Sequence, residues 1–212
     1  MRHFSLGRLL IALTIIAFFA TCRPDPGPSI PLKTSLPRIG TIPQRANVLG
    51  YERSAFGPGW ARLSNGCTTR DVALQHALND APPNHCPVRS GTGTDPYSGM
   101  LIGVTQGADI ELDHVYPLRA AWDMGAHSWT SQQRIQFAND PRNLIVASKE
   151  TNQEKSDSLP SEWMPPDPQT HCWYARRVAE VAATWGLPLT TSDAKTMTNA
   201  CFFRETITLP LR

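Results

Sequence analysis

Three side chains near the middle of this chain of 212 residues have the chemistry of a metal-assisted hydrolytic site. His114 follows Asp113 directly, and Asn152 lies further along the chain. An imidazole has an unperturbed pKa of about 6.5, so near neutral pH much of it is uncharged and able to accept a proton. Carboxylate and amide oxygens are the ligands that hard divalent cations prefer. Such residues suit a site that activates water beside a bound cation.

The residues around the Asp-His pair predict a β-strand. Apolar residues recur along positions 110–115, and Pro117 ends the strand because proline cannot donate a hydrogen bond to a sheet. Neighbouring strand residues point to opposite faces. Asp113 and His114 can therefore serve one site only if the strand ends or bulges at this pair, or if the site wraps round the strand's end.

A second strand and a helix are predicted further along the chain. The apolar run from Leu144 to Ala147 reads as a short strand, with Asn143 directly before it. Ser148 is a suitable N-cap for a following helix. That helix carries Asn152 and Lys155 three residues apart, on neighbouring positions of one face.

Three short motifs occur in a fixed order: Asp113-His114-Val115-Tyr116-Pro117, Arg142-Asn143-Leu144 and Asn152-Gln153-Glu154-Lys155-Ser156-Asp157. Each motif alone is weak, but the ordered series is much more specific. It resembles the HNH, or ββα-metal, nuclease finger, and most closely the secreted proteins related to the C-terminal domain of GmrSD-type restriction enzymes. The likeness runs from Tyr51 to about Trp163 and includes Phe56-Gly57, Trp60, Gly66 to Arg70, Asp95 to Gly99, Ala121-Trp122 and Phe137 to Asp140.

The resemblance implies a role for each motif residue. His114 would be the general base, and Asp113 and Asn152 would bind the metal. Asn143 would tie the connecting loop and so orient the His114 ring. Lys155 would contact a phosphate as a point charge. Each residue taken singly also has an ordinary structural explanation, as a turn, helix or surface residue, and it is their joint order that favours the site.

The resemblance also implies a cofactor and a substrate. Related fingers often carry a histidine where this chain has Asn152, and an oxygen ligand favours one Mg²⁺ or Mn²⁺ ion over Zn²⁺. Asp109 and Glu111 are further carboxylates close to the site in sequence. The implied activity is a metal-dependent endonuclease that hydrolyses nucleic acid, DNA or RNA, without sequence preference. The alternatives are another metal-dependent phosphoesterase and an inactive exported protein that keeps the fold for binding.

The beginning of the chain reads as an export signal. In residues 1–22, basic residues precede an apolar core from Leu9 to Ala20, which is shorter than the about 20 residues that a membrane span needs. We therefore expect a secreted protein, and a lipoprotein anchored to the membrane through Cys22 is the alternative. Residues 23–46 are rich in proline and are expected to form an extended linker. Residues 47–212 have the size of one nuclease domain.

The charge of the chain gives no general support for binding to nucleic acid. The formal net charge is +2, and it falls to 0 without residues 1–22, which contain two arginines and no acidic residue. Attraction of a polyanion must then come from local arginines. The candidates are Arg70, Arg89, Arg119, Arg134 and Arg142, and of these Arg70 and Arg142 are the ones that we assign to substrate binding. Arg70 lies in the first turn of a predicted helix, where a cation is unfavourable without a partner.

Four cysteines remain in the predicted domain, namely Cys67, Cys86, Cys172 and Cys201. In an exported protein they suggest two disulfides, for which three pairings exist. Proximity along the chain favours Cys67 with Cys86 and Cys172 with Cys201. A zinc site is the alternative, although the chain has no Cys-x-x-Cys pair.

Together these features predict an α+β fold, in which a ββα-metal finger with a helical insert is embedded in a mainly helical domain braced by disulfides. A turn is expected at residues 95–99. N-cap residues and apolar periodicity place the remaining helices. They are expected at residues 69–79, capped by Thr68 or Thr69, at 118–124, at 130–139 with a capping box from Thr130 to Gln133, at 170–185, and at 191–203 capped by Thr191 or Ser192.

Overall fold

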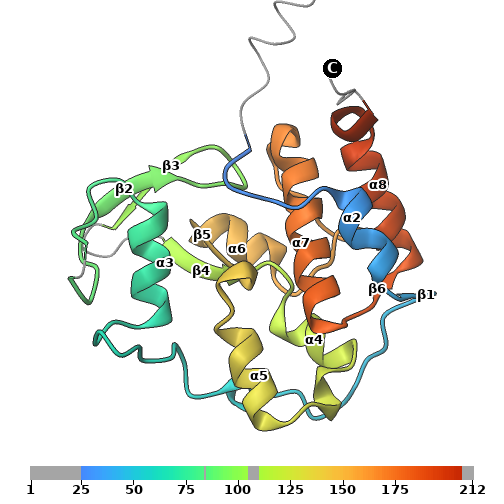
Figure 1. Cartoon of the computed structure of the whole chain (residues 1–212), viewed down its shortest axis with the longest axis horizontal. Helices are drawn as coiled ribbons and strands as arrows, with labels where there is room; N and C mark the ends of the chain where they lie inside the picture. The colour runs from blue at the N-terminus through green and yellow to red at the C-terminus, as the bar shows by residue number, and fades with distance from the viewer. Residues whose placement is uncertain (1–24, 84, 105–109, 207–212) are drawn as a thin grey trace, which may run out of the picture.

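The computed structural model describes residues 25–83, 85–104 and 110–206 of the chain (Figure 1). Helices and three two-stranded sheets make up this part of the protein, which confirms the predicted α+β class. Within the same residues, no helix has both the length and the apolar character needed to cross a membrane. The predicted signal segment, Cys22 and Asp109 lie outside the described residues.

A strand, a second strand and a helix form the centre of the fold. β4 (Ile110–His114) and β5 (Leu144–Ser148) pair antiparallel along their whole length. α6 (Lys149–Lys155) follows at once, and the Ser148 hydroxyl caps it by accepting a hydrogen bond from the amide of Thr151. The predicted order is therefore present. β4 ends at the histidine of the Asp-His pair, which is one of the predicted alternatives.

The insert between β4 and β5 is helical, as predicted. Thr130 and Gln133 form the expected capping box, in which each side chain bonds the backbone of the other residue. The insert comprises α4 (Leu118–Asp123), η3 (Ala126–Ser128), α5 (Ser131–Ala138) and η4 (Pro141–Asn143).

One face of the β4–β5 pair is covered by α3 (Thr69–Ala77), which begins after the predicted cap Thr68 and ends two residues before the predicted end. A hairpin of β2 (Gly91–Thr94) and β3 (Leu101–Val104) extends this side of the molecule (Figure 1). Together they enclose the smaller core, whose buried residues are Leu74, Leu78, Val88, Ile102, Ile110, Leu112, Leu144 and Val146.

The other face of the pair belongs to the larger core, which α7 (His171–Trp185) crosses. η5 (Pro168–Thr170) leads into α7, and Gly186 ends it in the left-handed conformation that glycine adopts without strain. α8 (Thr191–Thr206) packs beside α7, as Figure 1 shows. Burial of Ile145 and Ala147 from β5 in this core joins the central unit to the helical layer.

The predicted cap of α8 is wrong by one residue. The hydroxyl of Thr190 accepts a hydrogen bond from the amide of Asp193 at 3.0 Å, and the Asp193 carboxylate accepts one from the Thr190 amide. Thr190 also lies in the short β6 (Leu189–Thr190). The strand holds Thr190 in extended backbone, so it takes the capping position ahead of the predicted Thr191 and Ser192.

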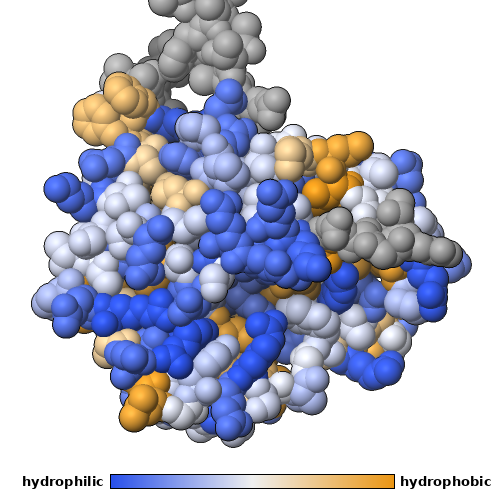
Figure 2. All heavy atoms as spheres, turned by 180° about the vertical axis from the view of Figure 1, so that it is seen from behind, coloured by the Kyte–Doolittle hydropathy of each residue, from blue (hydrophilic) through white to orange (hydrophobic). Residues whose placement is uncertain are grey.

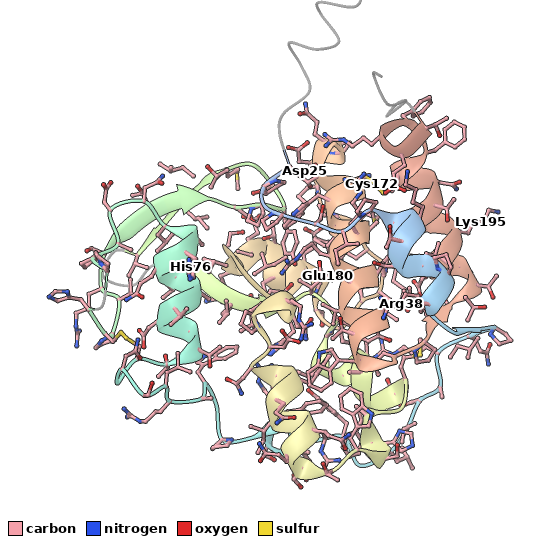
Figure 3. All side chains as sticks on the ribbon, viewed as in Figure 1. Asp25, Arg38, His76, Cys172, Glu180 and Lys195 are labelled. Atoms are coloured by element: carbon pink, nitrogen blue, oxygen red, sulfur yellow. A yellow bond between two sulfur atoms is a disulfide. The ribbon has the colours of Figure 1, made fainter. Side chains whose placement is uncertain are left out.

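Both predicted disulfides are present (Figure 3). Cys67 bonds Cys86 beside α3, and Cys172 bonds Cys201 between α7 and α8. Each disulfide closes a loop and thereby stabilises the fold by about 3–4 kcal/mol in the chain-entropy model.

The described part of the predicted linker is folded against the domain. It contains α2 (Leu32–Ser35), η1 (Leu36–Arg38) and β1 (Thr41–Ile42), and β1 pairs in parallel with β6. Leu32 and Ile39 are buried in the larger core. The prediction of an extended linker is therefore wrong for this stretch, because burial of these apolar side chains against the helical layer is favourable.

The surface is mainly polar. Figure 2 shows a face covered largely by hydrophilic side chains, with apolar ones in small separate groups. The largest apolar exposures in the described chain are at Leu49, Leu101 and Phe203. The buried apolar residues form the two cores, which fix the β4–β5 pair from both sides.

Candidate functional site

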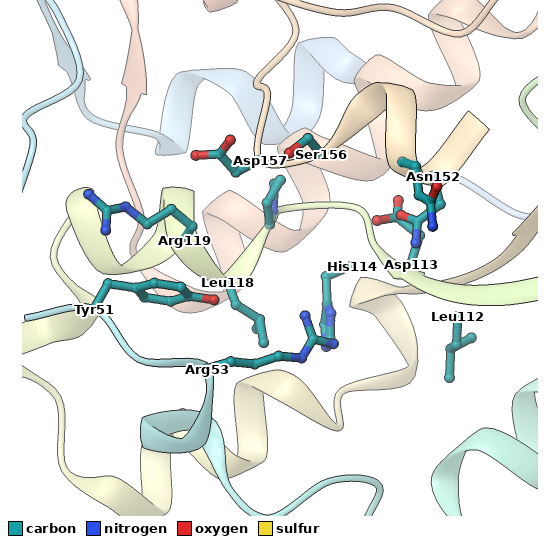
Figure 4. Close-up of a pocket in the computed structure, with 12 residues that line it drawn as sticks. Tyr51, Arg53, Leu112, Asp113, His114, Leu118, Arg119, Asn152, Ser156 and Asp157 are labelled. Carbon is teal, nitrogen blue, oxygen red and sulfur yellow. The ribbon is translucent and has the colours of Figure 1, made fainter. Parts of the chain in front are cut away.

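The candidate site lies at the C-terminal end of β4, where the two faces of the strand meet. Along β4, Leu112 faces the smaller core, and alternation places His114 on that same side and Asp113 on the opposite side. Asp113, His114 and Asn152 nevertheless line one pocket of about 380 Å³ (Figure 4). The site therefore wraps round the end of the strand, as the alternation argument allowed.

Asp113 is held by two buried donors. The ammonium of Lys155 lies 3.0 Å from Oδ1, and the hydroxyl of Tyr97 donates to Oδ2 at 2.6 Å. Burial raises the pKa of Asp113, while the charge of Lys155 and the hydrogen bond from Tyr97 hold it down. Burial raises the pKa of Tyr97 well above its usual range, so its hydroxyl stays protonated and donates. Both donors match the carboxylate form of Asp113.

Lys155 does not have the position predicted for a phosphate contact. Its side chain is 0% exposed, and its ammonium also donates to the backbone carbonyl of His114 at 2.9 Å. Lys155 thus joins the carboxylate of Asp113 to the backbone of His114. The predicted phosphate contact is wrong for this structure, because the face of α6 that carries Lys155 packs inward against β4.

Asn143 makes the loop contacts that were predicted for it. Its side-chain oxygen accepts from the amide of Tyr116 at 2.8 Å, and its side-chain nitrogen donates to the carbonyl of Tyr116 at 3.2 Å. The carbonyl of Asn143 also accepts from the amide of Val115. Asn143 is fully buried and ties the chain that leaves β4 to the chain that enters β5. Its effect on catalysis stays a prediction.

The ring of His114 is fixed by a carbonyl and an indole. Nε2 lies 2.9 Å from the carbonyl oxygen of Ala138, and the ring stacks on Trp60 with centroids 5.5 Å apart. A carbonyl can only accept, so Nε2 carries the proton of the neutral ring and Nδ1 carries the lone pair.

Burial lowers the pKa of His114 to about 3. The positive charges of Arg53 and Lys155 act in the same direction, and the bond to Ala138 opposes them. The ring is therefore neutral at pH 7.

The oxygen atoms on the other side of the pocket suit a hard cation. The amide nitrogen of Asn152 donates to Glu111 at 2.6 Å, which leaves the amide oxygen of Asn152 as a ligand atom. Each oxygen of Asp113 accepts one of the hydrogen bonds described above and keeps a further lone pair. A carboxylate and an amide oxygen, without thiolate or imidazole, match the preference of Mg²⁺ or Mn²⁺. The donor set thus fits the predicted ion.

Two comparisons place the chain among known proteins. The model of the GmrSD restriction endonuclease C-terminal domain matches residues 74–200, a range that includes Asp113, His114, Asn143 and Asn152. The chain belongs to this family. It is also 34% identical over 195 residues to an uncharacterized secreted protein of Arthroderma benhamiae, across 90% of this chain and 94% of that protein. No solved structure matches.

Membership of the GmrSD C-terminal family suggests a nuclease function of the HNH type. The similarity to a secreted protein and the two disulfides are consistent with an extracellular location. The family match covers both strands and the helix of the central unit.

The two arginines predicted for substrate binding do not line the pocket of this GmrSD-family chain. Arg142 pairs with Asp140 at 2.8 Å, and its side chain is 49% exposed. Arg70 lies at the start of α3, where one of its terminal nitrogens is buried and has no hydrogen-bond partner among the described residues. Among the described residues, neither arginine lines either of the two pockets that His114 lines. Their binding of substrate stays a prediction without support from this geometry.

The structure places several residues at the site that the sequence motifs do not indicate. Tyr97 was placed in a turn, and the turn is present, but its hydroxyl reaches Asp113. Asp95 of the same turn is buried and accepts from Thr151 in α6, so the turn braces the helix. Trp60 and Arg53 complete the surroundings of the site, together with Glu111 and Arg119, which the sequence already indicated as a nearby carboxylate and a candidate arginine. The likeness to known family members at Trp60 and at residues 95–99 was the available signal for Trp60 and Tyr97.

Proposed function

We propose that this protein is a secreted endonuclease that depends on a divalent metal and hydrolyses phosphodiester bonds in nucleic acid. The observation that carries the proposal is that His114, whose Nε2 is oriented by the carbonyl of Ala138, lines one pocket together with Asp113 and Asn152. A proton acceptor and a hard-cation site side by side are what hydrolysis of a phosphodiester needs.

His114 acts as the general base in this proposal. Nδ1 takes a proton from the attacking water, and the resulting positive charge is eased by the bond from Nε2 to the Ala138 carbonyl. Trp60 and Asn143 keep the ring and its loop in position. Asp113 and Asn152 would hold one Mg²⁺ or Mn²⁺ ion. When bound, such an ion supplies Lewis-acid stabilisation of charge on the phosphate and the leaving oxygen.

The roles of the supporting residues follow from their contacts. Lys155 and Tyr97 fix both oxygens of Asp113, so this carboxylate is preorganised as a ligand. Glu111 fixes the amide of Asn152 with its oxygen available. As the resemblance to HNH nucleases implies, we propose that the enzyme cleaves DNA and RNA without sequence preference.

The experiment uses the purified protein with intact disulfides, plasmid DNA and structured RNA, with and without Mg²⁺ or Mn²⁺. We expect cleavage that requires metal and falls at least about 100-fold in His114→Ala, the smaller end of general-base effects. His76→Ala is the matched control, because His76 is exposed on α3 and does not line the pocket (Figure 3). Equal cleavage by His114→Ala and wild type would remove His114 as the base.

A metal titration tests the ligands separately. Asn152→Ala should need a higher concentration of Mg²⁺ or Mn²⁺ for half-maximal cleavage, and an unchanged titration would remove Asn152 from the ligand set. Cleavage of a small phosphodiester without cleavage of either polymer would instead identify a phosphoesterase. Binding of nucleic acid without cleavage in any metal would support an inactive binding protein.

A further inference from the structure

Two pockets meet at His114. The pocket of about 380 Å³ lies on the side of Asn152, and a second pocket of about 150 Å³ lies on the side of Trp60. Arg53, His114 and Leu118 line both pockets. These three side chains therefore form the ridge between two adjoining cavities. A ligand that spans both cavities must pass over this ridge.

Arg53 differs from the other charged residues of the larger pocket. Asp113 is paired with Lys155. Asp157 on the rim is paired with Arg45, and Arg119 is paired with Asp123. Arg53 is exposed in the short η2 helix (Arg53–Phe56), and its guanidinium has no hydrogen bond or ion pair with any described residue. Within the described part of the chain, the positive charge of Arg53 at the ridge thus has no counterion (Figure 4).

The shape and chemistry of the ridge suit a phosphodiester. A guanidinium offers a planar set of donors that matches two phosphate oxygens, and it keeps its charge at any physiological pH. The smaller pocket is lined mainly by apolar groups, including Phe56, Trp60 and Ala138, while the larger pocket is mainly polar. A nucleotide chain has a charged phosphate between two bulkier neighbours, which corresponds to one cation between two cavities.

We propose that Arg53 binds the phosphate that is cleaved, so that the strand crosses the ridge with one flanking nucleotide in each pocket. This inference rests on the proposed function, because it takes nucleic acid as the ligand. Arg53 would hold the phosphate beside His114, and it would do so by charge and hydrogen bonding without contacting a base. Nothing in the three sequence motifs indicates this residue, which lies well before them in the chain.

Binding is measured by fluorescence anisotropy with a labelled single-stranded oligonucleotide and its duplex, at several salt concentrations and without divalent ions. We expect Arg53→Ala to weaken binding about tenfold and to reduce the slope of log K against log salt by roughly 0.7–0.9, the contribution of one phosphate contact. Arg53→Lys should keep the slope and recover part of the affinity, because lysine preserves the charge without the planar donors.

Arg89→Ala is the matched control, since Arg89 is also exposed but lines neither pocket. If Arg53→Ala has the affinity and salt slope of Arg89→Ala, the inference is overturned. The cleavage assay separates this failure from failure of the proposed function. A wild type that cleaves, with Arg53→Ala unchanged in binding, contradicts only the role of Arg53. If the wild type binds oligonucleotide through Arg53 but never cleaves it, the result supports phosphate binding by Arg53 and contradicts the proposed nuclease activity.

Discussion

The two sides of the β4 end are built in opposite ways. On the side of Asp113, the carboxylate is paired with two donors inside the protein, and both donors, Lys155 and Tyr97, are almost without exposed surface. On the side of Arg53, the pocket is open and a guanidinium lacks a partner among the described residues. His114 lies between the two environments. Its backbone carbonyl accepts a hydrogen bond from Lys155, and the residue also lines the smaller pocket beside Arg53.

The difference indicates that the two sides have separate functions. Ligand atoms for a cation must be held within a fraction of an ångström, and buried hydrogen bonds provide that rigidity. A substrate must enter and leave, so the groups that receive it need exposure and unsatisfied charge. We call the side of Asp113 the closed side and the side of Arg53 the open side. We expect changes on the closed side to affect mainly stability, and changes on the open side to affect mainly binding.

The largest effect should come from the closed side, in Lys155→Met. The change leaves the buried carboxylate of Asp113 without its cation and the carbonyl of His114 without a donor. Breaking a buried ion pair by removing one partner costs about 3–5 kcal/mol. Denaturant unfolding of the metal-free protein would measure this loss, with Lys149→Met as the exposed control in the same helix.

A double variant shows whether the loss arises from the unpaired charge. Asp113→Asn removes the charge that Lys155→Met would leave behind, so the double variant should be more stable than the sum of the two single changes predicts. The coupling should lie within about 0.5–3 kcal/mol. Additive effects would mean that the loss in Lys155→Met does not arise from the charge of Asp113 and comes instead from the lost hydrogen bond to the carbonyl of His114.

Tyr97→Phe should have the next largest effect. It removes a buried hydrogen bond of 2.6 Å to a carboxylate, and bonds to charged groups contribute about 1.5–3 kcal/mol. Tyr174→Phe is a close control, because the hydroxyl of Tyr174 is buried and has no partner among the described residues. Its removal should be neutral or slightly stabilising. Equal losses of unfolding free energy in the two variants would contradict the role given to Asp113 as the acceptor.

The fold was predictable where local chemistry determines it. Thr68, Thr130 and Ser148 cap their helices through bonds to residues three positions on, so a reader of the sequence can place these starts. The packing of residues 25–46 was not predictable in this way. Leu32 and Ile39 are isolated apolar residues among prolines, and their burial depends on α7 and α8, which lie far along the chain.

The residues of the candidate site likewise fall into those that the sequence predicts and those that it does not. Asp113, His114 and Asn152 follow from motif order and line one pocket. The inward position of Lys155 depends on how α6 packs against β4, and spacing along a helix gives only its relation to Asn152. Tyr97 and Arg53 reach the site from a separate turn and a separate short helix. The family likeness at residues 95–99 marked the turn that holds Tyr97, but no local pattern indicated that its hydroxyl contacts Asp113 or that Arg53 lines the pocket.

The turn at Asp140, which leads through η4 into β5, should respond to acid. Burial alone would raise the pKa of Asp140, but hydrogen bonds from Arg142 and Trp185 lower it. A carboxyl group with a lowered folded pKa adds stability above its unfolded pKa of about 3.9, and this stability is lost as pH falls through the folded value. Asp140→Asn should therefore be less stable than wild type at pH 7, by roughly 1 kcal/mol because Arg142 is half exposed.

The difference between Asp140→Asn and wild type should shrink as the solution is acidified, since both proteins then carry a neutral side chain at this position. Unfolding free energies measured from neutral pH down to strongly acidic pH would show this convergence. A constant difference would mean that the charge of Asp140 contributes nothing, and that the asparagine acts through altered hydrogen bonds with Trp185.

The smallest effect on stability should come from the open side, in Arg53→Ala. An exposed side chain without internal partners contributes within about 0.5 kcal/mol to the free energy of unfolding, although the same change should weaken oligonucleotide binding. Chemical denaturation of Arg53→Ala beside wild type tests this separation of stability from binding. A loss larger than about 1 kcal/mol, beyond what surface substitutions cost, would show that Arg53 supports the fold. The contrast between the closed and open sides of the β4 end would then fail at the residue that defines the open side.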